Sequence, residues 1–185
     1  MTRGIACRPA QTTRAESAAA TLPGRAQDMH TFEYQQSSQS LANGIAEYFE
    51  ANPSLAKGRG LSPAAHEFFR CHDAVHVVFG CGTALNEEAV VKIASILGTT
   101  GGLGVLRGYR LHESLEIYKK LRVVAVLFSI AQSVFVVPRT IFRCLKQTRR
   151  WPWNNFEQYM QIPLREIREE FGIRVAHFHA QEPDT

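Results

Sequence analysis

Hydrophobic residues recur along most of this chain at the spacing of helices rather than strands. The first predicted helix covers residues 38–51. Its apolar face is formed by positions i, i+4, i+7 and i+8, which are Leu41, Ile45, Tyr48 and Phe49. Asn52 and Pro53 end it, because a proline disfavours the helical conformation in the residue before it.

The second predicted helix runs from Ser62 to about Phe79. Ser62 suits the N-cap and Pro63 suits the first helical position. The apolar side chains available to its buried face are Phe68, Cys71, Val75, Val78 and Phe79. The Gly80-Cys81-Gly82 sequence breaks the helix, since glycine commonly ends helices in the left-handed conformation.

A third helix is predicted after this break, with Thr83 or Asn86 as its cap. Its inward positions are Ala89, Val90, Ile93, Ile96 and Leu97. The glycine-rich segment 98–104 that follows lacks the G-K-[ST] ending of a phosphate-binding loop. It is therefore interpreted as a flexible break, either a hinge or a close backbone contact.

A long helical region is predicted from about 111 to 146, and its middle, 123–137, is apolar almost all round. Those residues would span about 22 Å as a helix, short of a hydrocarbon layer of about 30 Å, so a simple transmembrane span is rejected. The flanks are basic: Lys119, Lys120, Arg122, Arg139, Arg143, Lys146, Arg149 and Arg150. A membrane-surface contact and an ordinary solvated rim around a core helix both fit this pattern.

The last predicted helix covers 156–171 and ends at Gly172. One stripe is apolar: Met160, Leu164, Ile167 and Phe171. The other face is charged: Arg165, Glu166, Arg168, Glu169 and Glu170. Because no strand-rich region or repeat is found, the prediction is an all-α, single-domain bundle of about six helices over 29–185, preceded by a disordered tail, 1–28.

Composition narrows the class of protein only slightly. The 185 residues carry a net charge of +4, which would favour binding to an anionic surface such as membrane lipid. The sequence contains no nucleic-acid-binding signature, so the charge is weak evidence for binding to nucleic acid. The four cysteines form no CxxC pair, which favours a reducing compartment. Cys71 and Cys81 lie near the histidines described next, either as soft metal ligands or as small buried side chains.

A cluster of ionisable residues spans the second and third helices. His72 and His76 are four residues apart and would share one face of a helix, the spacing by which two imidazoles bind one cation. Asp73 is close enough to add an oxygen, and Glu88 would complete the site from the next helix. Such a donor set suits Zn²⁺, Fe²⁺ or Mn²⁺.

The same residues have a purely structural interpretation. A histidine pair at this spacing also occurs in ordinary helices, and Glu87 or Glu88 would favour the positive end of the helix dipole. Against it, the segment 74–81 is otherwise almost wholly apolar or small. Ionisable groups in such a segment are costly unless they are paired or bound to metal.

The pattern His72-Asp73-x-x-His76-x11-Glu88 also resembles a known family. Together with AVVKI at 89–93 and the closing segment at 156–173, it is similar to the Coq-four family of ubiquinone (coenzyme Q) biosynthesis proteins. The resemblance covers about 65–97 and 151–173 and is weak in 30–60 and between Glu88 and Trp151. It implies that the metal ligands and catalytic residues are His72, Asp73, His76 and Glu88, and that the ion is usually zinc.

The resemblance further implies an all-helical homodimer attached peripherally to a membrane. The expected location is the cytoplasmic face in a bacterium or the matrix side of the mitochondrial inner membrane in a eukaryote. The expected ligand is a polyprenylated quinone precursor or another isoprenoid lipid, and the expected partners are other quinone-biosynthesis enzymes.

Three functions remain open at this point. The first is metal-dependent oxidative decarboxylation at ring carbon one of a polyprenylated hydroxybenzoate. The second is a non-catalytic lipid-binding scaffold for the biosynthetic complex. The third is an HD-type phosphohydrolase, which would require further ligands such as His66, His112 or His177.

Overall fold

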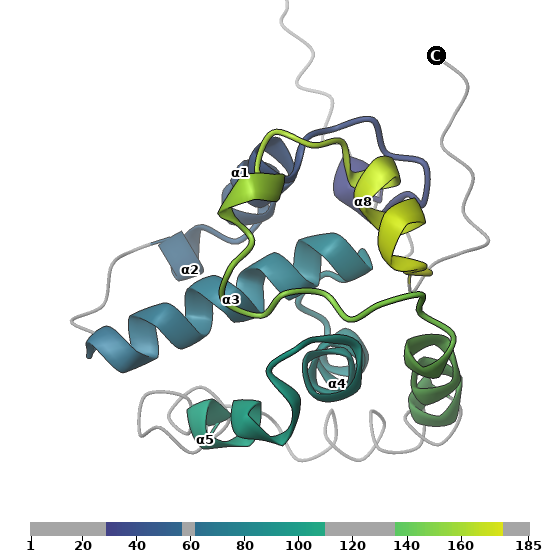
Figure 1. Ribbon diagram of the computed structural model, residues 1–185. Helices are drawn as coiled ribbons and strands as arrows, with labels where there is room; N and C mark the ends of the chain where they lie inside the picture. Colours follow the sequence, from purple (N-terminus) through teal and green to yellow (C-terminus); the bar gives the residue numbers. More distant parts are fainter. Residues whose placement is uncertain (1–28, 57–61, 110–135, 176–185) are drawn as a thin grey trace, which may run out of the picture.

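In a computed structural model, residues 29–56, 62–109 and 136–175 are described, and every regular element among them is a helix (Figure 1). The predicted all-α fold class is confirmed for this part of the chain. The predicted tail, 1–28, and almost all of the apolar stretch 123–137 lie outside the described residues.

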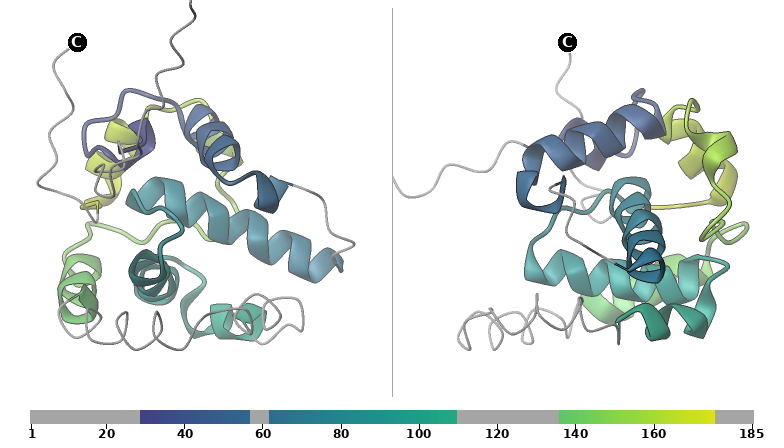
Figure 2. Two further views of the ribbon diagram at one scale, coloured as in Figure 1. Left: turned by 180° about the vertical axis from the view of Figure 1, so that it is seen from behind. Right: turned by 90° about the vertical axis from the view of Figure 1, so that its left-hand side faces the viewer.

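Helix α3 (Pro63–Phe79) crosses the centre of the molecule. Helices α1 (Leu41–Ala51) and α8 (Leu164–Phe171) lie on one side of it, and α4 (Leu85–Ile93) and α5 (Leu106–Tyr109) lie on the other (Figures 1 and 2). All four contact α3. The last turns of α3 are therefore the hydrophobic centre of the fold and carry the buried side chains of Ala74, Val75, Val77, Val78 and Phe79.

Both ends of α3 follow the local signals in the sequence. The Ser62 hydroxyl accepts a hydrogen bond from the Ala65 N–H at 3.2 Å, as expected of an N-cap. At the other end Gly80 has a φ of +62°, and the Cys81 N–H donates to the His76 carbonyl at 2.8 Å. This left-handed ending confirms the predicted break and places both histidines in the last two turns.

Helix α4 begins differently from the prediction. Its N-cap is Ala84 rather than Thr83 or Asn86, and the Ala84 N–H donates to the carboxylate of Glu87 at 3.2 Å. Glu87 thus fills the glutamate position of a capping box and satisfies the Ala84 N–H, while alanine supplies no side-chain acceptor for the first turn. The helix then widens into a π-helical turn, Ala94–Gly98.

The glycine-rich segment 98–104 makes a close backbone contact, one of its two predicted interpretations. A Cβ at Gly98 would lie 2.9 Å from the ring of Phe79. The Trp151 N–H donates to the Gly98 carbonyl at 2.9 Å, and the Thr100 N–H donates to the Trp151 carbonyl at 2.8 Å. This segment is therefore bonded to the C-terminal part of the chain, before a 3₁₀ turn at Gly102–Val105 leads into α5.

The last helix is shorter than predicted. A 3₁₀ turn occupies Glu157–Tyr159, and α8 starts only at Leu164, after Pro163. The prediction of a continuous helix from 156 is wrong because Pro163 has no N–H and disfavours the helical conformation at Ile162. Gly172, with a φ of +67°, confirms the predicted end.

Arg168 also departs from the prediction, which placed it on the exposed charged face of this helix. Its side chain is 1% exposed, and its hydrogen bonds within the described residues all go to main-chain carbonyls. Two acceptors, Val77 and Val78, are at the end of α3, and two, Phe32 and Tyr34, lie in and beside the 3₁₀ turn Thr31–Glu33. Arg168 therefore joins α8, α3 and the start of the described chain.

Residues 136–145 form a further helix beside α4 (Figure 1). The large hydrophobic side chains most exposed in the described part of the chain lie here and around α5: Leu103, Leu106, Phe142 and Leu145. Within the described residues, no helix has the length and hydropathy needed to cross a bilayer.

Candidate metal centre

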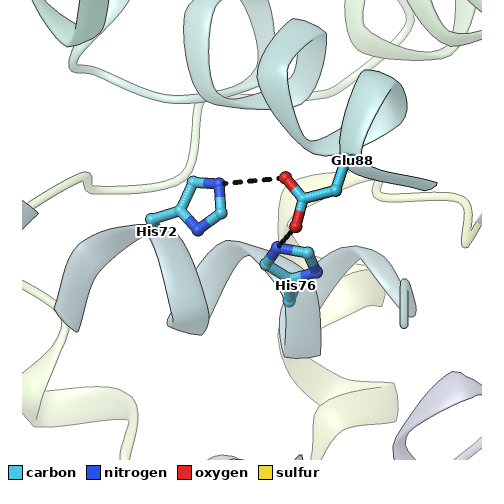
Figure 3. Close-up of side chains that lie close together, drawn as sticks. All are labelled: His72, His76 and Glu88. Atoms are coloured by element: carbon cyan, nitrogen blue, oxygen red, sulfur yellow. Dashed lines mark ion pairs between the residues drawn. The ribbon is translucent and has the colours of Figure 1, made fainter. Parts of the chain in front are cut away.

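The structure brings three of the four predicted site residues together between α3 and α4. His72 and His76 project from successive turns of α3, and Glu88 reaches them from the first turn of α4 (Figure 3). Glu88 Oε1 lies 3.4 Å from His76 Nε2, and Glu88 Oε2 lies 3.8 Å from His72 Nε2. One ligand atom from each residue lies within 4.8 Å of the others, a spacing that suits a shared cation.

The two imidazoles are buried with unsatisfied nitrogens. His76 is 0% exposed and His72 is 7% exposed, and neither Nε2 atom has a hydrogen-bond partner among the described residues. A buried polar atom without a partner costs about 1–3 kcal/mol. A cation between the two Nε2 atoms and the Glu88 carboxylate would remove this cost, so the donor set fits a metal ion.

The hydrogen bonds of His76 fix which of its ring nitrogens can bind a metal. Nδ1 lies 2.9 Å from the Gly82 carbonyl and 3.3 Å from the Cys81 carbonyl. Carbonyl oxygens only accept, so Nδ1 must carry a proton and donate. In the neutral ring the lone pair is then on Nε2 and faces Glu88, which is the orientation that metal-binding histidines usually have.

Asp73 is not part of this group of three. Its Oδ1 lies 3.6 Å from Nδ1 of His72, on the nitrogen that does not face Glu88. A carboxylate on that side orients the ring and makes the Nε2 lone pair a stronger ligand for a metal ion. The described geometry thus places Asp73 behind His72, while the candidate ligand atoms belong to the other three residues.

The electrostatic environment couples His76 to Glu88. Burial alone would lower the pKa of His76, but the neighbouring Glu88 carboxylate, with smaller contributions from Asp73 and the Cys81 carbonyl, raises it overall. Burial alone would raise the pKa of Glu88, but His76, His72 and Lys92 lower it overall. Without a metal the pair therefore favours an imidazolium and a carboxylate, so a proton and a metal ion compete for the same place.

Aromatic rings pack on both sides of the histidines. Tyr48 of α1 lies 5.1 Å from the His76 ring, and Phe68 and Tyr109 each lie 5.7 Å from the His72 ring, all between ring centroids. Burial, followed by the charges of Asp73 and Glu88, raises the pKa of Tyr48, so its hydroxyl keeps its proton. The hydrophobic pattern predicts Tyr48 and Phe68 only as members of apolar helix faces, and it gives no signal for Tyr109, which approaches His72 through the tertiary fold.

Cys71 and Cys81 are buried and lie outside the group of three. The Cys71 thiol donates to Glu67 at 3.5 Å, and the Cys81 thiol donates to the Phe79 carbonyl at 3.6 Å. Burial raises the pKa of Cys71 to about 12, which disfavours the thiolate that metals bind. Their positions favour the interpretation as small buried side chains.

The further ligand that an HD phosphohydrolase would need is not found in the described part of the chain. His66 lies on α3 but is exposed and outside the group of three. The other two predicted candidates, His112 and His177, lie outside the described residues.

Comparison of the chain with protein-family models, with curated proteins and with solved structures finds no match.

Proposed function

We propose that the chain binds one divalent transition-metal ion between α3 and α4, with zinc favoured and iron or manganese as alternatives. The ligands are Nε2 of His72, Nε2 of His76 and the carboxylate of Glu88. The observation that carries this proposal is the pair of buried Nε2 atoms that face one carboxylate and have no hydrogen-bond partner within residues 29–56, 62–109 and 136–175. Two imidazoles and one carboxylate also leave an open coordination position, as catalytic sites require.

The activity that best combines this site with the family resemblance is metal-dependent decarboxylation in ubiquinone biosynthesis. A bound ion would supply Lewis-acid stabilisation of a carboxylate or phenolate on the substrate. The protein's own contribution is to orient the ligands: the Gly82 carbonyl holds His76, and Asp73 holds His72. The rings of Tyr48, Phe68 and Tyr109 exclude water around the histidines.

The same resemblance supports peripheral attachment to a membrane, binding of a polyprenyl chain, homodimer formation and contact with other quinone-biosynthesis enzymes. The exposed side chains of Leu103, Leu106, Phe142 and Leu145 support an apolar contact of this kind. They equally support the second candidate function, a lipid-binding scaffold in which the ion is structural. Decarboxylation of a polyprenylated hydroxybenzoate, followed as release of carbon dioxide, would favour the enzyme over the scaffold.

The test of the metal site is elemental analysis of the purified chain and two variants. His76→Ala removes a ligand, whereas His66→Ala makes the same change at an exposed position on the same helix. We expect about one zinc or iron per chain in the native protein and in His66→Ala, and none in His76→Ala. Absence of metal after zinc and ferrous iron are supplied, or full retention in His76→Ala, would overturn the proposal.

A further inference from the structure

A cavity of about 430 Å³ lies beside α8, and none of the proposed metal ligands lines it. Figure 1 shows α8 and α4 on opposite sides of α3, so the cavity and the proposed ion are on different sides of that helix. Its size is within the range of small-molecule sites, about 300–1,000 Å³. Most of the residues that line it have polar or charged side chains: Gln35, Gln36, Arg165, Arg168, Glu169 and Arg174.

One charged face of α8 forms a wall of this cavity. Arg165, Arg168 and Glu169 follow the three- and four-residue spacing that places side chains on the same face of a helix. The Arg165 side chain is 51% exposed, and among the described residues its ion pair is with Glu166, 3.9 Å away. An exposed pair at that distance contributes little free energy, so the guanidinium of Arg165 is available to a ligand.

Arg168 adds a buried positive charge to the same wall. Its hydrogen bonds satisfy its donors, but every acceptor in the described residues is a neutral main-chain carbonyl. None of the ion pairs among the described residues includes it. Burial lowers the pKa of Arg168, and no carboxylate of the described residues raises it again. Buried charges are usually paired, so this guanidinium favours an anion in the adjoining cavity.

The carboxylate of Glu169 offsets only part of the positive charge. On α8 alone, two arginines and one glutamate line the cavity, which leaves one positive charge in excess. Arg174 lines the cavity as well, and the balance stays positive whether or not another group pairs with Arg174. Guanidinium groups bind phosphate through two parallel hydrogen bonds, so a phosphate group matches both the charge and the donors of this wall.

We propose that the cavity beside α8 binds a phosphate group, with Arg165 as its direct contact and the buried charge of Arg168 as electrostatic support. The phosphate belongs either to a soluble phosphate ester or to the headgroup of a phospholipid, and both carry the chemistry that the arginines recognise. This inference goes beyond the proposed function, because it uses none of the metal ligands and does not depend on the ion.

Isothermal titration calorimetry of the full chain with inorganic phosphate and glycerol 3-phosphate tests this proposal. Metal is first removed with a chelator, so that phosphate cannot bind an ion at the histidines. Acetate carries one negative charge, whereas a phosphate monoester carries about 1.5–2 at pH 7, so acetate should bind more weakly. Co-sedimentation with phosphatidylcholine vesicles, with and without phosphatidic acid, tests the phospholipid source.

Two substitutions should change phosphate affinity in opposite directions. Arg165→Gln should weaken binding about tenfold, because it removes a hydrogen bond between charged groups. Glu169→Gln should strengthen binding about threefold, because it removes a negative charge from the cavity wall. The matched controls are Arg150→Gln and Glu50→Gln, which make the same changes of net charge at exposed positions outside the cavity and should leave the affinity unchanged.

The outcomes separate the two sources from the failure of the proposal. Binding of glycerol 3-phosphate that Arg165→Gln weakens would support a soluble ester. Binding only to vesicles that contain phosphatidic acid, with the same loss in Arg165→Gln, would support a headgroup. No binding to either, equal losses in Arg165→Gln and Arg150→Gln, or acetate binding as tight as phosphate binding would overturn the proposal and leave the metal site standing. Circular dichroism of each variant checks that the helices are retained.

Discussion

Two buried polar groups lie near the end of α3, and they differ in how their hydrogen-bonding atoms are used. The Arg168 guanidinium donates to four main-chain carbonyls from two other parts of the chain. The histidine pair instead has two buried Nε2 atoms that find no hydrogen-bond partner in the described part of the chain. Burial is otherwise similar, since Arg168 is 1% exposed and His76 is 0% exposed.

The difference separates a structural group from a candidate binding site. Arg168 is satisfied by the protein itself, so its contribution is to hold α8, α3 and the preceding turn together. Burial lowers its pKa to about 9, but the four acceptors favour the charged form. The histidines and Glu88 are satisfied only when something from outside the chain, a proton or a metal ion, occupies the space between them.

The largest effect is expected from removing Arg168. Arg168→Met would leave the carbonyls of Phe32 and Val78 without this donor, while those of Tyr34 and Val77 would keep the N–H groups of Ser37 and Gly80. The two unsatisfied acceptors should lower the free energy of unfolding by about 3–5 kcal/mol. Urea denaturation measures this change. Arg165→Met, on the same helix with a side chain 51% exposed, is the control and should change stability by less than about 0.5 kcal/mol. Similar stabilities of the two variants would contradict the structural role of Arg168.

A smaller effect should separate the adjacent glutamates of α4. Zinc at a hundred times its dissociation constant should stabilise the native chain by about 2.7 kcal/mol, measured by denaturation with and without the metal. Glu88→Gln should lose most of this stabilisation, because Glu88 faces both histidines. Glu87→Gln should keep it, because Glu87 caps the helix at Ala84. Equal zinc stabilisation of both variants would remove Glu88 from the site.

The smallest effect concerns pH in the metal-free chain. The pKa of His76 is raised from 6.5 in the folded chain. Its contribution to the free energy of unfolding is therefore fully present below pH 6.5 and is lost as the pH rises through the raised pKa. The pKa of Glu88 is lowered from 4.5 in the folded chain. Its contribution to the free energy of unfolding is therefore fully present above pH 4.5 and is lost as the pH falls through the lowered pKa. The pair should therefore stabilise the chelator-treated protein most between these two reference values.

Urea unfolding across this range, compared with Glu88→Gln, checks the prediction. The variant should show a flatter pH profile because the imidazolium has lost its charged partner. Zinc should act in the opposite direction, stabilising the native chain more as the pH rises, since protons compete with the ion for the histidines. Identical profiles for the native chain and the variant would contradict the coupling.

The features that the sequence predicted correctly depend on neighbouring residues. Ser62 and Gly80 define the ends of α3 through contacts within a few positions, and the spacing of His72 and His76 is a property of one helix. Glu88 was singled out by the spacing of the motif, although Glu87 suited a helix N-terminus equally well. Only the packing of α4 on α3 shows which of the two carboxylates faces the histidines.

The features that the sequence pattern does not predict correctly depend on contacts between distant residues, with one exception. The start of α8 is marked by a local signal, Pro163. Arg168 is surrounded by charged residues in the sequence, but its acceptors lie up to 136 positions away, so its burial has no local signature. Tyr109 reaches His72 because Gly108 allows α5 to approach Phe68. At the start of α8, the apolar stripe that begins at Met160 suggested a longer helix in spite of the proline.

The four hydrogen bonds of Arg168 also affect the order in which parts of the fold can form during protein synthesis. Its bonds span 90 to 136 positions, and contacts of such sequence separation form slowly. A chain emerging from the ribosome at about 5–20 residues per second exposes both histidines and Glu88 several seconds before α8 becomes available. The nascent chain would therefore present the proposed metal ligands before Arg168 anchors the end of α3. An ion bound at that stage would help to align α3 and α4 before α8 packs against them.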